Sequence, residues 1–366
     1  MPRRVHPSRI PAVKSLFSYW SRRPSKQSKQ RLARGFRLAA ESLETRAVFS
    51  ATAFTPDLDA ASDTGFSSTD NRTADTTPTF TIQAAGATAV KLFRVSGKQA
   101  TEIGTASPLT GSAWTATVSP LVAGKYSIAA QAFTDGVAGK LSKPLAIEIG
   151  TVAPSIPTIG LDAKSDSGFT GDRITNLSSP VLTGRSQPGT VVLLTSPSVA
   201  GGVEQRITVN GKGVWSFRAP ALADGQHAFT VKSQNVFGLE SNAATLTITV
   251  DTVRPYVVGM RYVPDVNEVE VEFSAPVRGV DVNDFRIWAP GFGLNNVSLT
   301  DKRIVENVGR ITVQDVSGGR VYRLRMSNPD VIGGTYTIRL VAAKSGIVDN
   351  VSGNPLPVDS AVTFTL

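Results

Sequence analysis

The sequence contains no cysteine and only two histidines, His6 and His227. Disulfides, thiol nucleophiles and cysteine-ligated zinc are therefore excluded, and little remains for histidine-based catalysis or metal binding. No stretch reaches the roughly 18 to 20 apolar residues that a membrane-spanning helix needs, so no membrane span is predicted. Charged residues make up 18% of the chain, below the roughly 25% of typical soluble domains. Thr, Ser, Gly and Val take their place, which favours strands joined by tight turns.

The net charge of +9 is concentrated at the N-terminus. Residues 1–50 hold 12 Lys and Arg against Glu41 and Glu44, a net charge of +10, which leaves −1 for the rest of the chain. A uniformly basic surface for nucleic acid is thus excluded. Only the basic tail could bind nucleic acid, in a salt-sensitive way, and we do not expect nucleic acid as a partner.

After residue 78 the sequence is a succession of short alternating segments bounded by Gly, Pro, Asn and Asp. Examples are Thr190–Leu194, Trp215–Ala219 and Thr245–Val250. Strand-length runs at this spacing, with no run long enough for a confident helix, are typical of an all-β sandwich or barrel. The roughly 315 residues after the tail fit three tandem sandwiches.

An internal repeat with a period near 101 residues supports this organisation. Leu58–Phe66 (LDAASDTGF) recurs as Leu161–Phe169 (LDAKSDSGF), Trp114 matches Trp215, and Thr151–Pro154 matches Thr252–Pro255. A period of about 100 residues is the size of one immunoglobulin-like sandwich.

Residues 153–252 resemble a bacterial Ig-like repeat of the kind found in surface adhesins, through LDAKSDSGFTGDRITN, SPVLTG, GKGVWSF, ALADGQHAFTV and the closing Asp251-Thr252. Residues 56–152 resemble a degenerate copy in which Gly150 stands where the next copy has Asp251. Residues 253–366 resemble a different bacterial Ig-like type, through VEVEFSAPVRGVDVNDFRI and GIVDNVSGNPL. The resemblance implies an all-β fold of three tandem immunoglobulin-like β-sandwiches.

Residues 1–55 form the basic leader, for which we expect disorder because its composition cannot bury a core. Its short apolar stretch, interrupted by Glu41 and Glu44, is a poor match to a conventional signal peptide. However, Leu43–Ala51 is similar to the LExR…SA motif that precedes secreted and surface proteins of planctomycete bacteria. The resemblance implies export. The alternative is a disordered leader that carries no targeting signal.

The acidic cluster Asp162, Asp166 and Asp172 is the best candidate for a bound ion, with Asp251 at the end of the same repeat. Ca²⁺ accepts six to eight oxygen ligands, which a flexible acidic loop can supply. Similar repeats often bind Ca²⁺ near their junctions, so the resemblance implies Ca²⁺ there. The alternative is that these side chains only cap turns through nearby backbone amides.

Catalysis is not expected. His227 corresponds to Tyr126 in the first copy, which favours a half-buried strand position over a catalytic one. Glu268, Glu270 and Glu272 alternate with apolar residues, the pattern of a strand with one solvated face. Trp114 and Trp215 are predicted core residues.

The sequence thus predicts a secreted or cell-surface protein with a structural or adhesive role. We expect a monomeric rod whose partner is an unidentified surface protein or polysaccharide. The alternative from another class is an accessory module of an extracellular carbohydrate-active or proteolytic enzyme.

Overall fold

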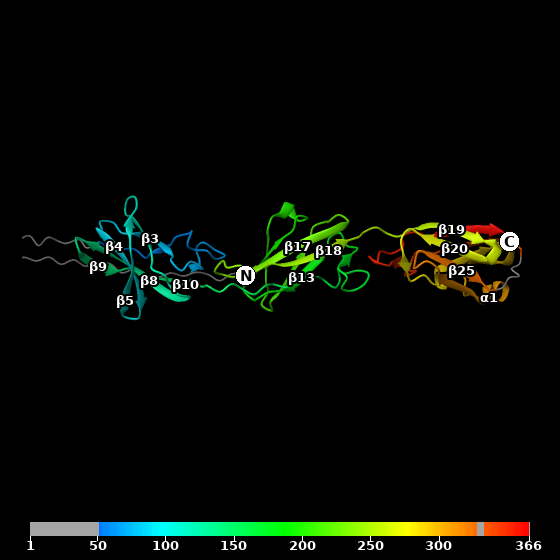
Figure 1. Ribbon diagram of the computed structural model, residues 1–366, viewed down its shortest axis with the longest axis horizontal. Coiled ribbons are helices and arrows are strands. Elements are labelled where there is room, and N and C mark those ends of the chain that lie inside the picture. The colour runs from blue at the N-terminus through cyan, green and yellow to red at the C-terminus, as the bar shows by residue number, and fades with distance from the viewer. Residues whose placement is uncertain (1–50, 328–332, 366) are drawn as a thin grey trace, which may run out of the picture. The chain divides into compact units, whose positions relative to one another are not determined.

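The computed structural model describes residues 51–327 and 333–365, all within one compact unit of the chain, Phe49–Leu366. The regular structure of the described residues is almost all β (Figure 1). The strands enclose three separate hydrophobic cores, which confirms the prediction of three tandem immunoglobulin-like sandwiches. The leader predicted over residues 1–55 lies, except for its last five residues, outside the described part. Of those five, Ala51 and Ala53 are buried in the first core.

The first sandwich packs two sheets around alternating apolar side chains. Phe80 and Ile82 from one sheet meet Val90 and Leu92 from the other, and all four are at most 1% exposed. One sheet has the order β1-β3-β7-β6 and the other β2-β10-β8-β4-β5, with β9 pairing β8. The strands are β1 (Asp57–Leu58), β2 (Arg72–Thr73), β3 (Thr79–Gln83), β4 (Ala89–Ser96), β5 (Gln99–Thr105), β6 (Ser107–Pro108), β7 (Ala113–Thr117), β8 (Gly124–Thr134), β9 (Val137–Leu141) and β10 (Leu145–Ile149).

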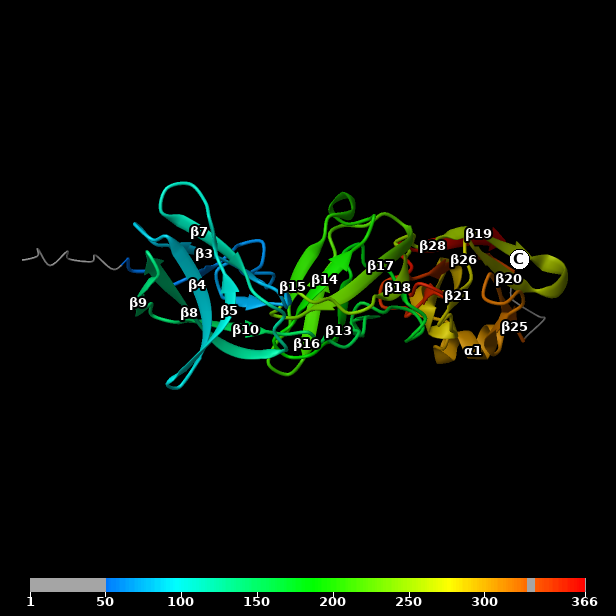
Figure 2. The ribbon, with the colours of Figure 1, turned by 60° about the vertical axis from the view of Figure 1, so that its left-hand side comes forward.

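The second sandwich repeats this arrangement, as the sequence repeat predicts. Its sheets have the orders β11-β13-β16 and β12-β18-β17-β14-β15, and Figure 2 shows its longer strands, β13 to β18. In both copies a short strand pairs in parallel with the last strand, β2 with β10 and β12 with β18. The strands are β11 (Gly160–Leu161), β12 (Ile174–Thr175), β13 (Val181–Arg185), β14 (Val191–Thr195), β15 (Gln205–Thr208), β16 (Val214–Arg218), β17 (Gly225–Gln234) and β18 (Ala244–Val250), with a 3₁₀ turn η1 (Ala200–Gly202).

The matched tryptophans lie in the cores of these two sandwiches. Trp114 is 9% exposed and Trp215 2% exposed, which confirms their predicted place. Each indole N–H donates to a backbone carbonyl, that of Ala84 at 3.3 Å and that of Thr158 at 3.2 Å. The polar edge of each ring is therefore satisfied inside the core.

The third sandwich has a different build, with two four-stranded sheets, β19-β20-β25-β24 and β23-β22-β26-β28, and a separate pair, β21-β27. Its strands are β19 (Val257–Val263), β20 (Glu268–Phe273), β21 (Val277–Arg278), β22 (Phe285–Ala289), β23 (Leu294–Ser298), β24 (Ile311–Asp315), β25 (Val321–Met326), β26 (Thr335–Leu340), β27 (Val348–Asp349) and β28 (Ser360–Thr365). It also contains the helix α1 (Lys302–Val308) and the 3₁₀ turns η2 (Pro264–Val266), η3 (Val282–Asp284) and η4 (Pro290–Phe292).

The glutamate face of β20 differs from the solvated face that the alternation predicts. Glu268 is 2% exposed, because Arg325 and Arg323 from β25 lie against its carboxylate at 2.6 and 3.7 Å. Glu270 is paired with Arg261 of β19 at 2.9 Å and with Arg323 at 3.1 Å. The hydrogen bond from Arg261 lowers the pKa of the Glu270 carboxyl below its usual value. Arginines on the neighbouring strands thus cover two of the three carboxylates.

Asp284 closes the turn η3 in a capping box. Its side chain accepts the Asp281 amide at 2.8 Å, and the Asp281 side chain accepts the Asn283 amide at 2.7 Å. Asp284 is only 6% exposed, and this burial raises the pKa of its carboxyl to about 6. The charged form is therefore disfavoured in the folded state.

Replacing Asp284 by Asn should change how the stability of the third sandwich depends on pH. Because the folded-state pKa is raised, the native form holds its proton longer than the unfolded chain, so wild-type stability falls as pH rises from about 4 to about 6. Asp284→Asn removes this pH-dependent contribution to the free energy of unfolding. The contribution is about 3 kcal/mol at most, because a change of one in pKa corresponds to about 1.36 kcal/mol. Calorimetry of both proteins from pH 4 to 8 measures it; parallel pH profiles would contradict the assignment.

Candidate functional site

The acidic loop between β11 and β12 holds three of the residues that the sequence singles out. Asp162 accepts the Lys164 amide at 3.0 Å, Asp166 the Gly171 amide at 2.5 Å, and Asp172 the Ile174 amide at 2.9 Å. These are the turn-capping bonds that Asp side chains commonly make. The loop therefore uses its carboxylates to satisfy backbone N–H groups that have no strand partner.

Asp251 lies at the other end of the same repeat, directly after β18. Its side chain accepts the Val253 amide at 3.1 Å, and its own amide donates to the Thr175 carbonyl at 2.9 Å. It too caps a turn of the backbone.

The equivalent loop of the first sandwich contains Asp59, Asp63 and Asp70. Asp63 is 4% exposed and accepts the Asn71 amide at 3.1 Å. Burial raises the pKa of the Asp63 carboxyl, and the nearby negative charge of Asp70 adds to the effect. The environment thus disfavours a second negative charge beside Asp70 unless a cation accompanies it.

One oxygen in each loop has no hydrogen-bond partner. The Oδ1 atoms of Asp63 and Asp166 are the buried side-chain polar atoms without a partner among the described residues. An unpaired buried carboxylate oxygen is costly and is the kind of ligand that Ca²⁺ accepts. However, residues 51–327 and 333–365 contain no group of three or more His, Cys, Asp or Glu placed to hold a metal ion. Calcium binding at Asp162, Asp166, Asp172 and Asp251 therefore stays a prediction.

His227 is buried at the start of β17, 9% exposed. Its Nε2 donates to the Ala223 carbonyl at 2.8 Å, which leaves Nδ1 to accept from the Ser198 hydroxyl at 2.8 Å. In the first sandwich Tyr126 donates its hydroxyl to the Val122 carbonyl, also at 2.8 Å. Both side chains thus tie a strand to the carbonyl four residues earlier, and no carboxylate orients the imidazole as in a catalytic triad. Ser198 belongs to no motif, so this contact could not be predicted from the sequence.

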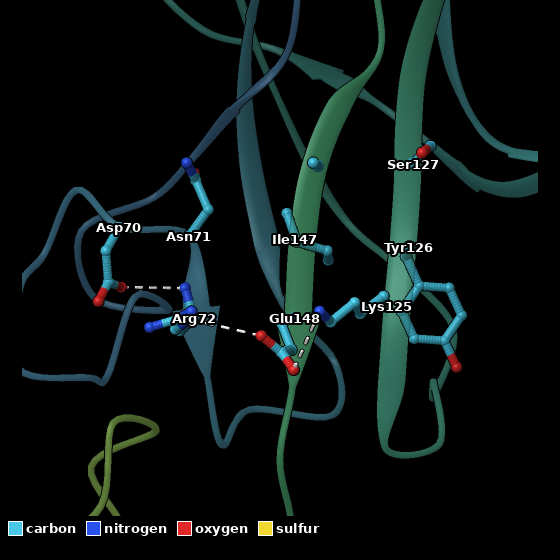
Figure 3. Close-up of a pocket in the computed structure, with 9 residues that line it drawn as sticks. Asp70, Asn71, Arg72, Lys125, Tyr126, Ser127, Ile147 and Glu148 are labelled. Carbon is cyan, nitrogen blue, oxygen red and sulfur yellow. Dashed lines mark hydrogen bonds and ion pairs between the residues drawn. The ribbon is translucent and has the colours of Figure 1, made fainter. Parts of the chain in front are cut away.

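A shallow polar hollow of about 300 Å³ lies on the first sandwich between β2, β8 and β10 (Figure 3). Glu148 lies between Arg72 and Lys125, at 3.4 and 4.0 Å, and Asp70 accepts the Arg72 amide at 3.1 Å. The hollow contains charged pairs and one aromatic ring, Tyr126, but no nucleophile paired with a base. Its lining thus offers charged groups and one aromatic ring to a contacting molecule.

Comparison with known proteins places the first two sandwiches in one family. A family model described as a bacterial Ig-like domain matches residues 50–151 and again residues 152–252. No relative was found among the curated proteins. None of the helices in the described part of the chain is long and apolar enough to cross a membrane.

Several solved structures match this chain at low identity. Fibronectin(III)-like modules of Clostridium thermocellum CbhA are 17% identical, covering 55% of this chain and 94% of theirs, with a TM-score of 0.34. The chicken CNTN1 FN1–FN3 domains are 14% identical, covering 86% and 98%, with a TM-score of 0.26. The BSP domain of a biofilm associated protein is 14% identical, covering 55% and 30%, with a TM-score of 0.20. Likeness at this level carries no argument about function.

Substitutions at His227 should separate a structural from a chemical role. His227→Phe leaves the Ala223 carbonyl without its donor and should cost about 1 to 3 kcal/mol, whereas His227→Tyr restores a donor of the kind found at Tyr126 and should cost less. Calorimetry of the full chain compares the two, with Tyr126→Phe as the matched deletion in the first sandwich. A His227→Tyr variant no more stable than His227→Phe would show that the donor does not matter.

Proposed function

The chain belongs to the bacterial Ig-like domain family, and we propose that it acts outside the cell or on the cell surface as a structural and adhesive protein without catalytic activity. The observation that carries the proposal is the tandem family match over residues 50–252, more than half of the chain. A third immunoglobulin-like sandwich follows directly. Modules of this kind present loops and sheet faces to partners, and function then depends on the surfaces they display.

The side chains that hydrolysis would need are engaged in structural contacts, which supports a non-catalytic role. His227, the only histidine in the described residues, has both ring nitrogens engaged in contacts that tie down its strand. The carboxylates of Glu268 and Glu270 are neutralised by arginines of β19 and β25. A glycosidase needs a carboxylic acid and a carboxylate facing each other across a sugar-binding cleft. The contacts of His227 and the Glu–Arg pairs of the third sandwich do not provide such an acid and base.

The partner that we propose is a surface protein or polysaccharide, bound by a monomer of this chain. The basic leader, whose Leu43–Ala51 segment resembles an export motif, supports delivery to the surface. Its concentration of charge separates it from the nearly neutral sandwiches, so binding of nucleic acid would be confined to the leader.

Cell fractionation tests the export proposal directly. The full-length protein should be found in the surface or extracellular fraction, and substitution of Glu44 and Arg46 by Ala within the motif should leave it in the cytoplasm. Arg22→Ala and Arg23→Ala, elsewhere in the leader, are the matched control and should be exported. Native protein confined to the cytoplasm would overturn the proposal.

Calcium at the acidic loops is a second part of the proposal, supported by the unpartnered Oδ1 atoms of Asp63 and Asp166. Asp162, Asp172 and Asp251 would add oxygens in the second sandwich. The ion would neutralise the Asp63 and Asp70 carboxylates, whose negative charges oppose each other in the first loop, and so would stabilise that loop.

Millimolar Ca²⁺ should therefore raise the melting temperature of the full chain relative to EDTA. For a weak extracellular site, tenfold excess over Kd adds about 1.4 kcal/mol, or a shift of several degrees. Asp166→Asn should reduce the shift, whereas Glu204→Gln, an exposed carboxylate of the same sandwich, should leave it unchanged. Equal melting of the wild-type protein in Ca²⁺ and EDTA would remove calcium from the proposal without affecting the surface role.

A further inference from the structure

The loop between β1 and β2 contains a hydroxyl, that of Thr64, that bonds both to its own sandwich and to the next one. Thr64 Oγ1 accepts the Ala74 amide of its own sandwich at 2.8 Å and donates to the Phe237 carbonyl of the second sandwich at 2.8 Å. Because the amide within the first sandwich fixes the oxygen, the hydroxyl proton is left to point toward the next domain.

The equivalent residue of the second sandwich makes the same pair of bonds. Ser167 Oγ accepts the Asn176 amide at 2.8 Å and donates to the Ser352 carbonyl of the third sandwich at 2.6 Å. Here Arg278 adds a clamp: it donates to the Gly168 carbonyl at 3.2 Å, and its guanidinium lies 4.6 Å from the centre of the Phe169 ring.

The glycine after each hydroxyl permits a close approach of two backbones. A Cβ added at Gly65 would lie 2.3 Å from the Val236 carbonyl oxygen, and one added at Gly168 would lie 2.0 Å from the Val351 carbonyl oxygen. No larger residue fits at either place without moving the facing loop. The Thr-Gly and Ser-Gly steps of the repeat are thus explained by contacts outside their own sandwich.

The facing loops share a sequence that the repeat comparison does not reveal. Asn235–Leu239 reads NVFGL and Asn350–Asn354 reads NVSGN, and the first two residues and the glycine coincide. Each loop also holds the linker that enters its domain: the Asn235 amide donates to the Val152 carbonyl and the Asn354 amide to the Val253 carbonyl, both at 2.9 Å. The second and third sandwiches therefore both receive the preceding domain on a loop with the sequence Asn-Val-x-Gly, although their sheets differ and the Asn that holds the linker is the first residue of one loop and the fifth of the other.

Side-chain size distinguishes the two junctions. At the first, a Cβ on Gly150 would lie 2.3 Å from the ring of Phe237. At the second, Asp251 stands in the place of Gly150 and Ser352 in the place of Phe237. The larger side chain is therefore in the receiving loop at the first junction (Phe237) and at the end of the preceding strand at the second (Asp251). A junction that combined Asp251 with Phe237 would place two large side chains in one space.

We propose that these contacts form a docking pair, in which the Ser/Thr-Gly tip of one sandwich fits the Asn-Val-x-Gly loop of the next, and the residues at 150 and 237, or at 251 and 352, match in size so that each tip packs against its own receiving loop. The partner of each surface is the following sandwich of the same chain. A second copy docking out of order, with its residue 251 against residue 237, is excluded by size. The docking pair fixes the relative orientation of the domains, whatever ligand the protein binds.

Spin-label distances across the first junction test whether the docking pair holds the two sandwiches in one orientation. Because the chain lacks cysteine, Gln99→Cys and Lys212→Cys, both exposed, supply one label on each sandwich. The unaltered junction should give a narrow distance distribution. Gly150→Asp should broaden it, and the double change Gly150→Asp with Phe237→Ser, which copies the second junction into the first, should restore the narrow distribution.

A label pair inside the second sandwich, Glu204→Cys with Lys212→Cys, should stay narrow in every variant and shows that the domain remains folded. A broad distribution for the unaltered junction, or a narrow one for Gly150→Asp, would overturn the docking pair. If the double variant gives a distance distribution as broad as that of Gly150→Asp, the proposed size matching of residues 150 and 237 is wrong. None of these outcomes depends on where the protein is located or whether it binds Ca²⁺.

Discussion

The loop that carries the chain from one sheet to the other, between β1 and β2 and again between β11 and β12, must satisfy its backbone amides without a strand partner. Asp, Ser and Thr side chains provide the bonds. Asp63 accepts the Asn71 amide within the loop at 3.1 Å, and Ser62 and Ser165 accept the amides of Thr79 and Val181 at the start of the strands that follow, at 3.0 and 2.9 Å. Because an unsatisfied buried amide is expensive, the loop has one stable conformation. That conformation leaves the unpartnered oxygen of Asp166 inside and the Ser167 hydroxyl at the tip.

In the third sandwich, charged side chains on neighbouring strands stabilise the arrangement of the sheet. Its strand register sets Glu268 opposite Arg325 and Glu270 opposite both Arg323 and Arg261. Cross-strand pairs of opposite charge contribute modestly each, but together they select the strand order β19-β20-β25 over alternatives that would leave a carboxylate buried alone. The domain thus shares the receiving loop of its neighbour while differing in how its sheet is held.

Much of the fold could be predicted from the sequence, because alternation and a repeat near 101 residues are local signals. Trp114 and Trp215 were correctly placed in the cores for this reason. The solvated face expected for Glu268 was wrong, since its arginine partners lie 55 or more residues away and only strand order brings them together. Likewise Gly150 looked like a lost carboxylate, and its reason, the ring of Phe237, lies in another domain. Non-local contacts of this kind leave no periodic trace.

The parallel pairing of β2 with β10 and of β12 with β18 has a mechanical consequence. In each of these sandwiches a strand near the start of the domain lies beside the strand from which the chain leaves it, and both run in the same direction. Tension applied through the chain would pull the two strands past each other lengthwise, so that their hydrogen bonds would share the load and fail together. Antiparallel hairpins pulled from their open ends instead lose one bond at a time. The two-residue strands β2 and β12, each paired with the strand from which the chain leaves, are therefore the ones that would set how much force each sandwich withstands before it opens.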